Sequence, residues 1–209
     1  DPAAFLREFD LRDDIAFDCQ TSYTFRGADV LLHAHIRPIG DLPNLPRIGL
    51  QWSLPRRFDQ FWWHGRGPLE TYPDRKQGMR LGLYHAPVDA LFTPYGRPQE
   101  NGARTDVTWA ACLDDTGAGL LVAGEGVTVS AQRLTAADLE AAGHLHQLKP
   151  RDEIILSVDF QHAGLGNASC GPGVLPKYTI PPREASFSLR LRPVRAGESL
   201  LDVAASMIF

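Results

Sequence analysis

The stretch WWHGRGPLETYPDR, residues 62–75, joins an aromatic segment to a charged loop. Aromatic side chains favour β-structure, so residues 58–63 are predicted to form a strand. Gly65, Gly67 and Pro68 are predicted to end that strand. The loop that follows carries charged and aromatic side chains, namely Glu70, Tyr72, Asp74 and Arg75. Such loops on a rigid β edge often bind ligands, although a tight turn closed by one ion pair would use the same residue types.

Two further motifs follow in the chain. One is Tyr95-Gly96-Arg97-Pro98-Gln99-Glu100-Asn101-Gly102-x-Arg104, and the other is Gly164-Leu165-Gly166-x-x-Ser169-Cys170-Gly171-Pro172-Gly173-Val174-Leu175-Pro176. They accompany Arg47-Ile48-Gly49 and the pattern Gly65-x-Gly67-Pro68-x-Glu70-x-Tyr72-x-Asp74-Arg75. Their order and spacing resemble the C-terminal β-domain, the small-chain type of domain 5, of the β-galactosidases of glycoside hydrolase family 2. The resemblance extends over residues 15–193.

This resemblance implies an all-β fold, a large antiparallel β-sandwich of the galactose-mutarotase type. It divides the chain into a lead-in (residues 1–14), the sandwich domain (15–193) and a C-terminal tail (194–209). The family's domain normally starts well before Asp1, so the resemblance also implies that the first strands are missing. A sheet edge left open in this way would need cover from a neighbour.

Hydrophobic periodicity alone predicts an all-β chain with two sheets, about eight or nine strands and one short helix. The expected strands are 15–25, 30–36, 47–54, 58–63, 104–113, 119–132, 153–161 and 185–192. Residues 78–98 are predicted to be mostly loop, because their apolar runs are short and broken by Gly and Pro. Thr135 and Asp138 form a capping-box pattern, which predicts a helix up to Ala142.

The composition is that of a globular domain. The chain has 209 residues, of which 44% are hydrophobic and 22% charged, and this length suits a single core. The net charge of −4 and the lack of Lys/Arg runs argue against nucleic acid or an anionic membrane as partner. No segment is apolar enough to span a bilayer, and the N-terminus lacks a signal-peptide pattern.

The cysteines point to a reducing compartment. Cys19, Cys112 and Cys170 are odd in number and widely spaced, so free thiols are expected in place of a disulfide framework or a zinc site. We therefore expect a cytoplasmic location.

Glycoside hydrolysis with retention needs two carboxyl groups about 5 to 5.5 Å apart. The candidates are Glu70, Asp74 and Glu100. In the family, both catalytic glutamates lie in a (β/α)₈ barrel, and this chain lacks the strand–helix alternation of a barrel. The resemblance therefore implies a β-galactosidase parent whose catalytic residues lie outside this chain, and a fragment that is inactive alone. We expect Glu70 and Glu100 to accept hydrogen bonds from backbone N–H groups, or from Arg75 and Arg104.

The glycine-rich loop late in the family's domain reaches over the mouth of the barrel in larger members. There it presents an aromatic side chain on which the sugar beyond galactose can stack. Cys170 stands at the matching position and has no aromatic face. The resemblance implies that Asn167, Ser169 and Cys170 are accessible on a rim that faces the substrate. His64 and His162 flank two motifs and are further candidates for hydrogen bonds to sugar hydroxyls, with structural hydrogen bonding as the alternative.

Two histidine pairs, His33 with His35 and His144 with His146, have a spacing of two. On a strand this spacing places both imidazoles on one face, but third and fourth ligands are missing, so we expect no metal site. We also expect no cofactor in this domain, although the family often uses Mg and Na at sites outside it. Three of the four tryptophans (Trp52, Trp62, Trp63 and Trp109) are expected in the core.

Three functions remain open at this point. The resemblance favours a non-catalytic β-galactosidase domain that completes the active-site rim and supports assembly. Its partners would be a galactoside substrate, the preceding domains of the same polypeptide and further copies in a homo-oligomer. The second possibility is a stand-alone carbohydrate-binding module. The third is a mutarotase-like enzyme, which needs a convergent histidine–carboxylate pair such as His64 with Glu70.

Overall fold

The computed structural model describes residues 15–167 and 171–206. Within them the chain forms nine strands: β1 (Ala16–Arg26), β2 (Asp29–Ile39), β3 (Arg47–Pro55), β4 (Gln60–Gly67), β5 (Arg80–Pro87), β6 (Arg104–Leu113), β7 (Gly119–Gln132), β8 (Glu153–His162) and β9 (Ala185–Val194). The α-helices are α2 (Ala136–Ala141) and α3 (Leu200–Ala205), and the 3₁₀-helices are η1 (Val88–Leu91), η2 (Leu145–Gln147) and η3 (Pro176–Tyr178). The predicted all-β sandwich is confirmed.

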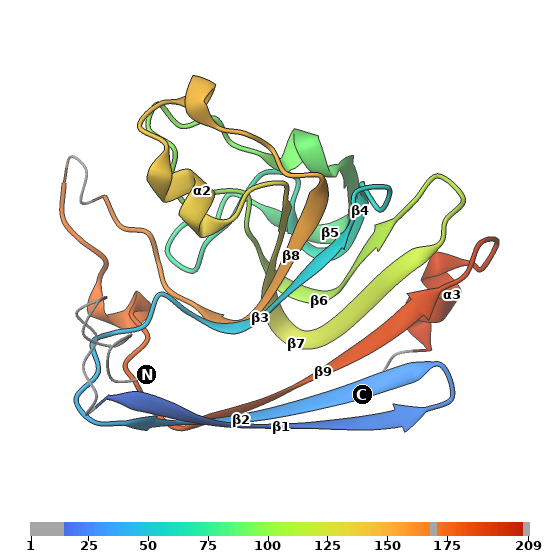
Figure 1. Cartoon of the computed structure of the whole chain (residues 1–209), viewed down its shortest axis with the longest axis horizontal. Helices are drawn as coiled ribbons and strands as arrows, with labels where there is room; N and C mark the ends of the chain where they lie inside the picture. The colour runs from blue at the N-terminus through green and yellow to red at the C-terminus, as the bar shows by residue number, and fades with distance from the viewer. Residues whose placement is uncertain (1–14, 168–170, 207–209) are drawn as a thin grey trace, which may run out of the picture.

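Strand β7 belongs to both layers of the sandwich (Figure 1). On one side it pairs first with β9, over Gly119–Ala123, and then with β8, over Thr128–Gln132. Strand β6 pairs along its other side. One layer therefore continues from β7 through β9 and β2 to β1. The other continues through β6 and β4 to β5, with β8 and β3 beside β7, and neighbouring strands are antiparallel.

The two layers diverge where β7 passes Gly124 and Gly126. A Cβ on Gly124 would lie 2.7 Å from Val127 Cγ1 and 2.8 Å from Leu189 Cδ2, so a larger side chain would not fit. Gly126 has a φ of 64°, a conformation in which a residue with a Cβ is strained. Glycines at these two positions let the strand bend from one layer into the other.

The core lies between the two layers and is apolar on both sides. Leu32 on β2 and Phe187 and Leu189 on β9 pack against side chains of the opposite layer, which include Phe61, Trp63, Val107, Val129, Ile154 and Leu156. Trp63 is 1% exposed, whereas Trp52, Trp62 and Trp109 are half-buried. Only one of the three tryptophans expected in the core is therefore fully enclosed. Trp62 and Trp109 face outward and pack against a second apolar cluster.

The predicted end of β4 is wrong. The strand continues through Gly65 to Gly67 and does not stop before Gly65. A Cβ on Gly65 would lie 2.6 Å from Val107 Cγ2 of the neighbouring strand β6. This glycine therefore allows two strands to pack closely and does not break one. The Gly67–Pro68 peptide bond that follows is cis.

Strand β5 and the short helices η1 and α3 were not expected from the sequence. The region 78–98, predicted to be mostly loop, contains β5 and η1. Strand β5 lies at a sheet edge with exposed and half-buried side chains, so it lacks the apolar run that marks an inner strand. Helix α3 lies in the tail and buries Val203 and Ala204 against the second cluster. The capping box at Thr135 is confirmed as the start of α2. In the described part of the chain, no helix is both long and apolar enough to cross a membrane.

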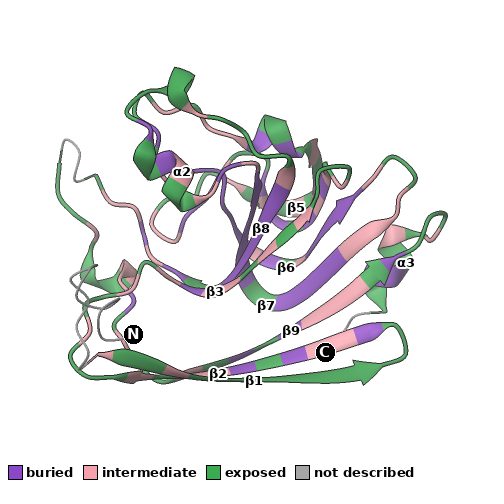
Figure 2. Ribbon diagram, in the orientation of Figure 1, coloured by how far each residue is buried: buried purple, intermediate pink, exposed green. Residues whose placement is uncertain are grey.

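Among the residues that the structure describes, β1 is the outermost strand of its layer and forms an open edge. It pairs with β2, and nearly all of its residues are exposed (Figure 2). Tyr23 lies opposite Leu32, and Phe25 lies opposite Val30, so both aromatic rings are on the face that points toward the core. Tyr23 is nevertheless 58% exposed and Phe25 75% exposed. The inner face of β1 thus extends beyond the cover that the opposite layer provides.

Candidate functional site

Asp74 ties the first sequence motif to the glycine-rich loop 164–176. Its carboxylate accepts hydrogen bonds from the backbone N–H groups of Leu165 at 3.1 Å and Gly166 at 2.8 Å. A Cβ on Gly164 would lie 2.6 Å from Asp74 Cγ, and Gly166 has a φ of 63°. The start of the loop therefore requires both glycines, and two motifs far apart in the sequence form one unit.

Glu70 ties the first motif to the second. Its carboxylate accepts hydrogen bonds from the backbone N–H of Gly102 at 2.7 Å, from Arg75 at 2.6 Å and from the hydroxyl of Tyr95. Gly102 has a φ of 78°, a backbone conformation that glycine adopts readily, and this conformation presents its N–H to Glu70. The prediction that Glu70 accepts hydrogen bonds from a backbone N–H group and from Arg75 is confirmed.

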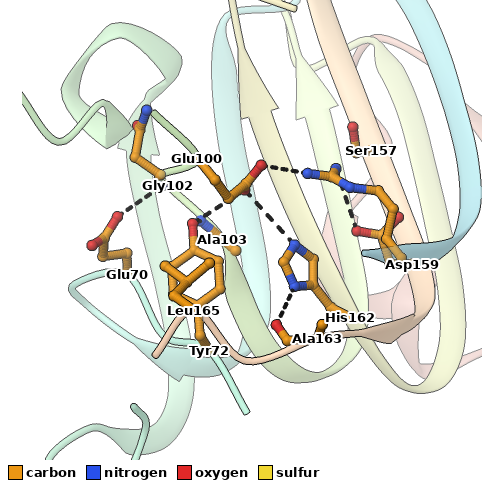
Figure 3. A network of polar contacts seen from close by, with 12 residues as sticks. Glu70, Tyr72, Glu100, Gly102, Ala103, Ser157, Asp159, His162, Ala163 and Leu165 are labelled. Carbon is orange, nitrogen blue, oxygen red and sulfur yellow. Dashed lines mark hydrogen bonds and ion pairs between the residues drawn. The ribbon is translucent and has the colours of Figure 1, made fainter. Parts of the chain in front are cut away.

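Glu100 lies at the centre of a buried polar network (Figure 3). It forms an ion pair with Arg47 on β3, and the Tyr72 hydroxyl donates to it at 3.2 Å. His162 Nε2 lies 3.8 Å from the same carboxylate. Burial opposes ionisation of Glu100, but the imidazole of His162 and the guanidinium of Arg47 outweigh it and hold the pKa below its usual range. Burial beside Glu100 and Glu70 raises the pKa of Tyr72.

Arg104 does not pair with Glu100, contrary to the prediction. Its Nη1 donates to the backbone carbonyls of Gly102 at 2.9 Å and Ala103 at 3.2 Å. Its guanidinium lies 5.1 Å from the ring centroid of Trp63. Burial lowers the pKa of Arg104 to about 10. Arg104 thus supports the turn that presents the Gly102 N–H, while Arg47 takes its place as the partner of Glu100.

Asp159 on β8 is a member of this network that the motifs did not reveal. It is 3% exposed, and its Oδ2 lies 3.6 Å from Arg47 Nη1. Burial raises the pKa of Asp159 to about 6, against the opposing charge of Arg47. A Cβ on Gly49 would lie 2.4 Å from Asp159 Oδ1, which explains the glycine in Arg47-Ile48-Gly49. A single charged residue within the largely apolar run of residues 154–160 was the signal that could have identified it.

The predicted rim residues that the structure describes do not gather at one place. Asn167 is exposed in the glycine-rich loop 164–176, whereas Ser169 and Cys170 lie outside the described residues. His64 is exposed on the outer face of β4, where its Nδ1 lies 2.8 Å from Thr108 Oγ1. His162 was expected on the rim, but its side chain is only 5% exposed, and its Nδ1 bonds to the Ala163 carbonyl at 2.8 Å. His162 thus belongs to the network, because the side chains of Tyr72 and Glu100 lie against it.

A cleft of about 990 Å³ lies beside the first motif. Trp63 and Arg104 line it, together with residues of the loop 68–79 and of the segment 90–94. Glu70 and Asp74 also line it, and both carboxylates accept hydrogen bonds from backbone N–H groups of other motifs. Both carboxylates of the cleft therefore take part in holding loops in position.

The two histidine pairs can also be placed. Within residues 15–167 and 171–206, no three His, Cys, Asp or Glu side chains form a group that could hold a metal ion. The Nδ1 atoms of His33 and His35 lie 3.0 Å and 2.8 Å from the hydroxyl groups of Ser188 and Ser186 on β9. His144 and His146 stack on one another with ring centroids 5.6 Å apart.

The comparison with protein families agrees with this arrangement. The family described as "Beta galactosidase small chain" matches residues 5–191. This chain belongs to the β-galactosidase small-chain family. It is 34% identical over 171 residues to a β-galactosidase of Priestia megaterium and 37% identical over 169 residues to one of Vibrio cholerae. Each match covers 80% of this chain and 16% of the relative, so the chain spans about a sixth of the length of these relatives.

Among solved structures, the chain is similar to a galactose mutarotase related enzyme from Lactobacillus acidophilus. The TM-score is 0.36 with 10% sequence identity, and the match covers 88% of this chain and 64% of that one. Family membership shows that the three motifs belong to one domain. They are the parts of a β-galactosidase small-chain domain that meet around Glu70, Asp74 and Glu100.

Proposed function

We propose that this β-galactosidase small-chain domain shapes the rim of an active site whose catalytic glutamates lie outside this chain. The parent polypeptide would hydrolyse terminal β-D-galactosides. This domain would hold the rim loop 164–176 over the bound sugar and would be inactive alone. Support comes from the family membership and from the use of Glu70, Asp74 and Glu100 as hydrogen-bond acceptors.

The hydrogen bonds of Asp74 carry this proposal. A loop that contacts a substrate must be held in one position, since misplacing a contact by about 1 Å can cost about a hundredfold in rate. Asp74 fixes the first two N–H groups after Gly164, and Asp74 is in turn part of the motif that holds Glu70. Asp74 therefore links the loop to the first motif, which follows strand β4.

The test is the variant Asp74→Asn in the full-length polypeptide, because an amide loses the charge that holds both N–H groups. We expect KM for lactose to rise more than the inhibition constant of galactose, since the loop is proposed to contact the sugar beyond galactose. Asp152→Asn is the matched control, because its side chain is 92% exposed. Equal kinetics for both variants would contradict a role of the loop in the rim.

Cys170 supplies a second test of the rim. A thiol offers no flat face to a pyranose, and an aromatic contact of that kind is worth about 1 kcal/mol. Cys170→Trp in the full-length polypeptide should therefore tighten binding of the sugar beyond galactose more than binding of galactose. A Cys170 thiol that does not react with a thiol reagent in the native state would contradict its place on the rim.

Assembly is the other half of the proposed function. The uncovered inner face of β1, with Tyr23 and Phe25, would pack against the preceding domains of the parent or a further copy in a homo-oligomer. Exposed aromatic side chains on an open sheet edge favour such contacts. A cytoplasmic location and the use of Mg or Na outside this chain remain predictions from the sequence.

A further inference from the structure

A second, smaller hollow lies on the other side of Pro73, Lys76 and Tyr178 from the cleft, since these three residues line both. We call it the polar hollow. Its volume is about 460 Å³, within the usual range for small-molecule sites. Polar and charged side chains make up most of its lining, including Asp106, Thr128, Gln161, Arg183 and Glu184. Neither the motifs nor the rim loop accounts for this site.

Asp106, which lines the polar hollow, has an unusual backbone conformation. It has a φ of 56°, and it is the non-glycine residue with positive φ among those that the structure describes. It lies in β6 where the register with β7 shifts between Arg104 and Val107. A bulge of this kind turns a side chain in a new direction and is frequent next to functional sites. An aspartate in this conformation costs free energy that a glycine would not, so its carboxylate must provide a compensating interaction.

The carboxylate of Asp106 is ionised, and only some of its hydrogen-bond acceptor positions are occupied. Lys76 Nζ donates to Oδ1 at 2.7 Å, and Arg66 Nε donates to Oδ2. Burial opposes ionisation, but these two hydrogen bonds outweigh it and keep the pKa of Asp106 below its usual range. A carboxylate can accept about four hydrogen bonds, so two positions remain. The side chain is 32% exposed, which leaves these positions open to a ligand.

The charges around the polar hollow define the class of ligand. Lys76, Lys177 and Arg183 line the hollow together with Asp106 and Glu184, so it contains both donors and acceptors with little net charge. Acidic side chains disfavour an anion, basic ones disfavour a cation, and the few apolar side chains disfavour a lipid. Neighbouring donors and acceptors suit vicinal hydroxyl groups, because each hydroxyl both donates and accepts.

We propose that the polar hollow binds one unit of a neutral saccharide, with Asp106 accepting hydrogen bonds from vicinal hydroxyl groups and Lys76 donating to one of them. This site needs no residue from outside the described chain. It goes beyond the proposed function, because a domain can shape an active-site rim without a sugar site of its own.

The test is titration of the 209-residue chain with galactose, glucose and lactose, followed by NMR shifts of the backbone amides. We expect saturable shifts at Asp106, Thr128 and Gln161 with at least one sugar. Asp106→Asn keeps the shape but removes the charge, so it should weaken binding about tenfold. Asp152→Asn, whose side chain is exposed, should bind as the unchanged chain does.

A third variant separates ligand binding from a structural role of Asp106. Asp106→Gly relieves the backbone strain but also removes the hydrogen bonds from Lys76 and Arg66, so it should unfold at nearly the same temperature as the unchanged chain and yet lose the sugar. A purely structural carboxylate predicts loss of thermal stability in both variants and unchanged binding in Asp106→Asn. Absence of saturable shifts with all three sugars, or saturation by inorganic phosphate instead, would overturn the proposal. Neither result would bear on the rim loop, which the Asp74 variant tests independently.

Discussion

The network around Glu100 and the open edge at β1 are opposite exceptions to the usual distribution of side chains. The network buries the side chains of Asp159 and His162 and half-buries those of Glu100 and Arg47. The edge places aromatic rings in solvent. Buried charges are costly unless they are paired, and exposed aromatic patches mark surfaces that meet another molecule. The difference separates two parts of the domain: the network connects β3 and β8 to two of the sequence motifs, whereas the edge leaves aromatic side chains exposed.

The largest loss of stability should follow from removing the carboxylate of Glu100, at the centre of the network. Glu100→Ala leaves Arg47 without its closest anionic partner, and loss of one member of a buried ion pair costs about 3 to 5 kcal/mol. Because the Glu100 side chain is 28% exposed, we expect the lower end of this range. Urea denaturation measures it, and Glu140→Ala on the exposed face of α2 is the control. Equal losses in the two variants would show that the network does not stabilise the fold.

Asp159 should make the free energy of unfolding depend on pH in a distinctive way. Its pKa is raised in the folded chain to about 6 from 3.8. Between these values the folded chain keeps a proton that the unfolded chain has lost, so the free energy of unfolding falls as pH rises. The total change is at most about 3 kcal/mol, since one pKa unit corresponds to about 1.4 kcal/mol.

Urea denaturation of the unchanged chain and of Asp159→Asn at pH 4, 5, 6 and 7 tests this effect. Other carboxylates are common to both chains, so their contributions cancel in the difference. We expect the advantage of Asp159→Asn to grow from pH 4 to pH 6 and then to level off. A difference that is constant with pH would show that Asp159 ionises normally in the folded chain.

A smaller loss of stability is expected where Asp74 of the first motif meets the glycine-rich loop 164–176. In Gly164→Ala the new Cβ would lie 2.6 Å from Asp74 Cγ, so either the loop or the carboxylate must move. Overpacking of this kind costs about 1 to 3 kcal/mol. Gly173→Ala in the same loop is the matched control, because no atom lies within 4 Å of its added Cβ. In thermal unfolding, Gly164→Ala should have a lower melting temperature than Gly173→Ala. Identical melting temperatures would contradict the close contact between Asp74 and Gly164.

The smallest effect on stability should come from the edge. Phe25→Ser removes a side chain that is 75% exposed, so the free energy of unfolding should change by no more than about 0.5 kcal/mol. Phe187→Ser, on the strand that pairs with β2, removes a ring that is 6% exposed and should cost at least about 3 kcal/mol. Phe25→Ser should instead weaken association of the chain with itself or with the rest of its polypeptide, measured by sedimentation. A stability loss comparable to that of Phe187→Ser would mean that the edge is covered within the chain.

Much of the fold could be predicted from local patterns. The hairpin of β6 and β7 follows from two apolar runs around the turn residues 114–117, and α2 follows from its capping box. Strand β5 could not be predicted, because an edge strand with both faces partly exposed carries no apolar run. The end of β4 was misplaced because glycine is required both by turns and by close strand packing, and the sequence does not distinguish the two uses.

The site was predictable in its parts but not in its connections. The motifs identified Glu70, Asp74 and Glu100, yet the partner of Glu100 is Arg47, which lies 53 residues away in the sequence. The burial of His162 depends on Tyr72 and Glu100, which come from other motifs. Asp106 was overlooked because its significance lies in a backbone conformation and a register shift, and neither leaves a local pattern.

The position of β9 has a consequence for synthesis of the chain. Strands β1 and β2 form a hairpin that can pair as soon as both have left the ribosome, but β2 reaches the rest of its layer through β9. His33 and its partner Ser188 are separated by 155 residues. At about 5 to 20 residues per second, the hairpin waits roughly 10 to 30 seconds for β9. Throughout that interval Leu32 and Ala34, later among the most enclosed side chains, are open to solvent and to chaperones.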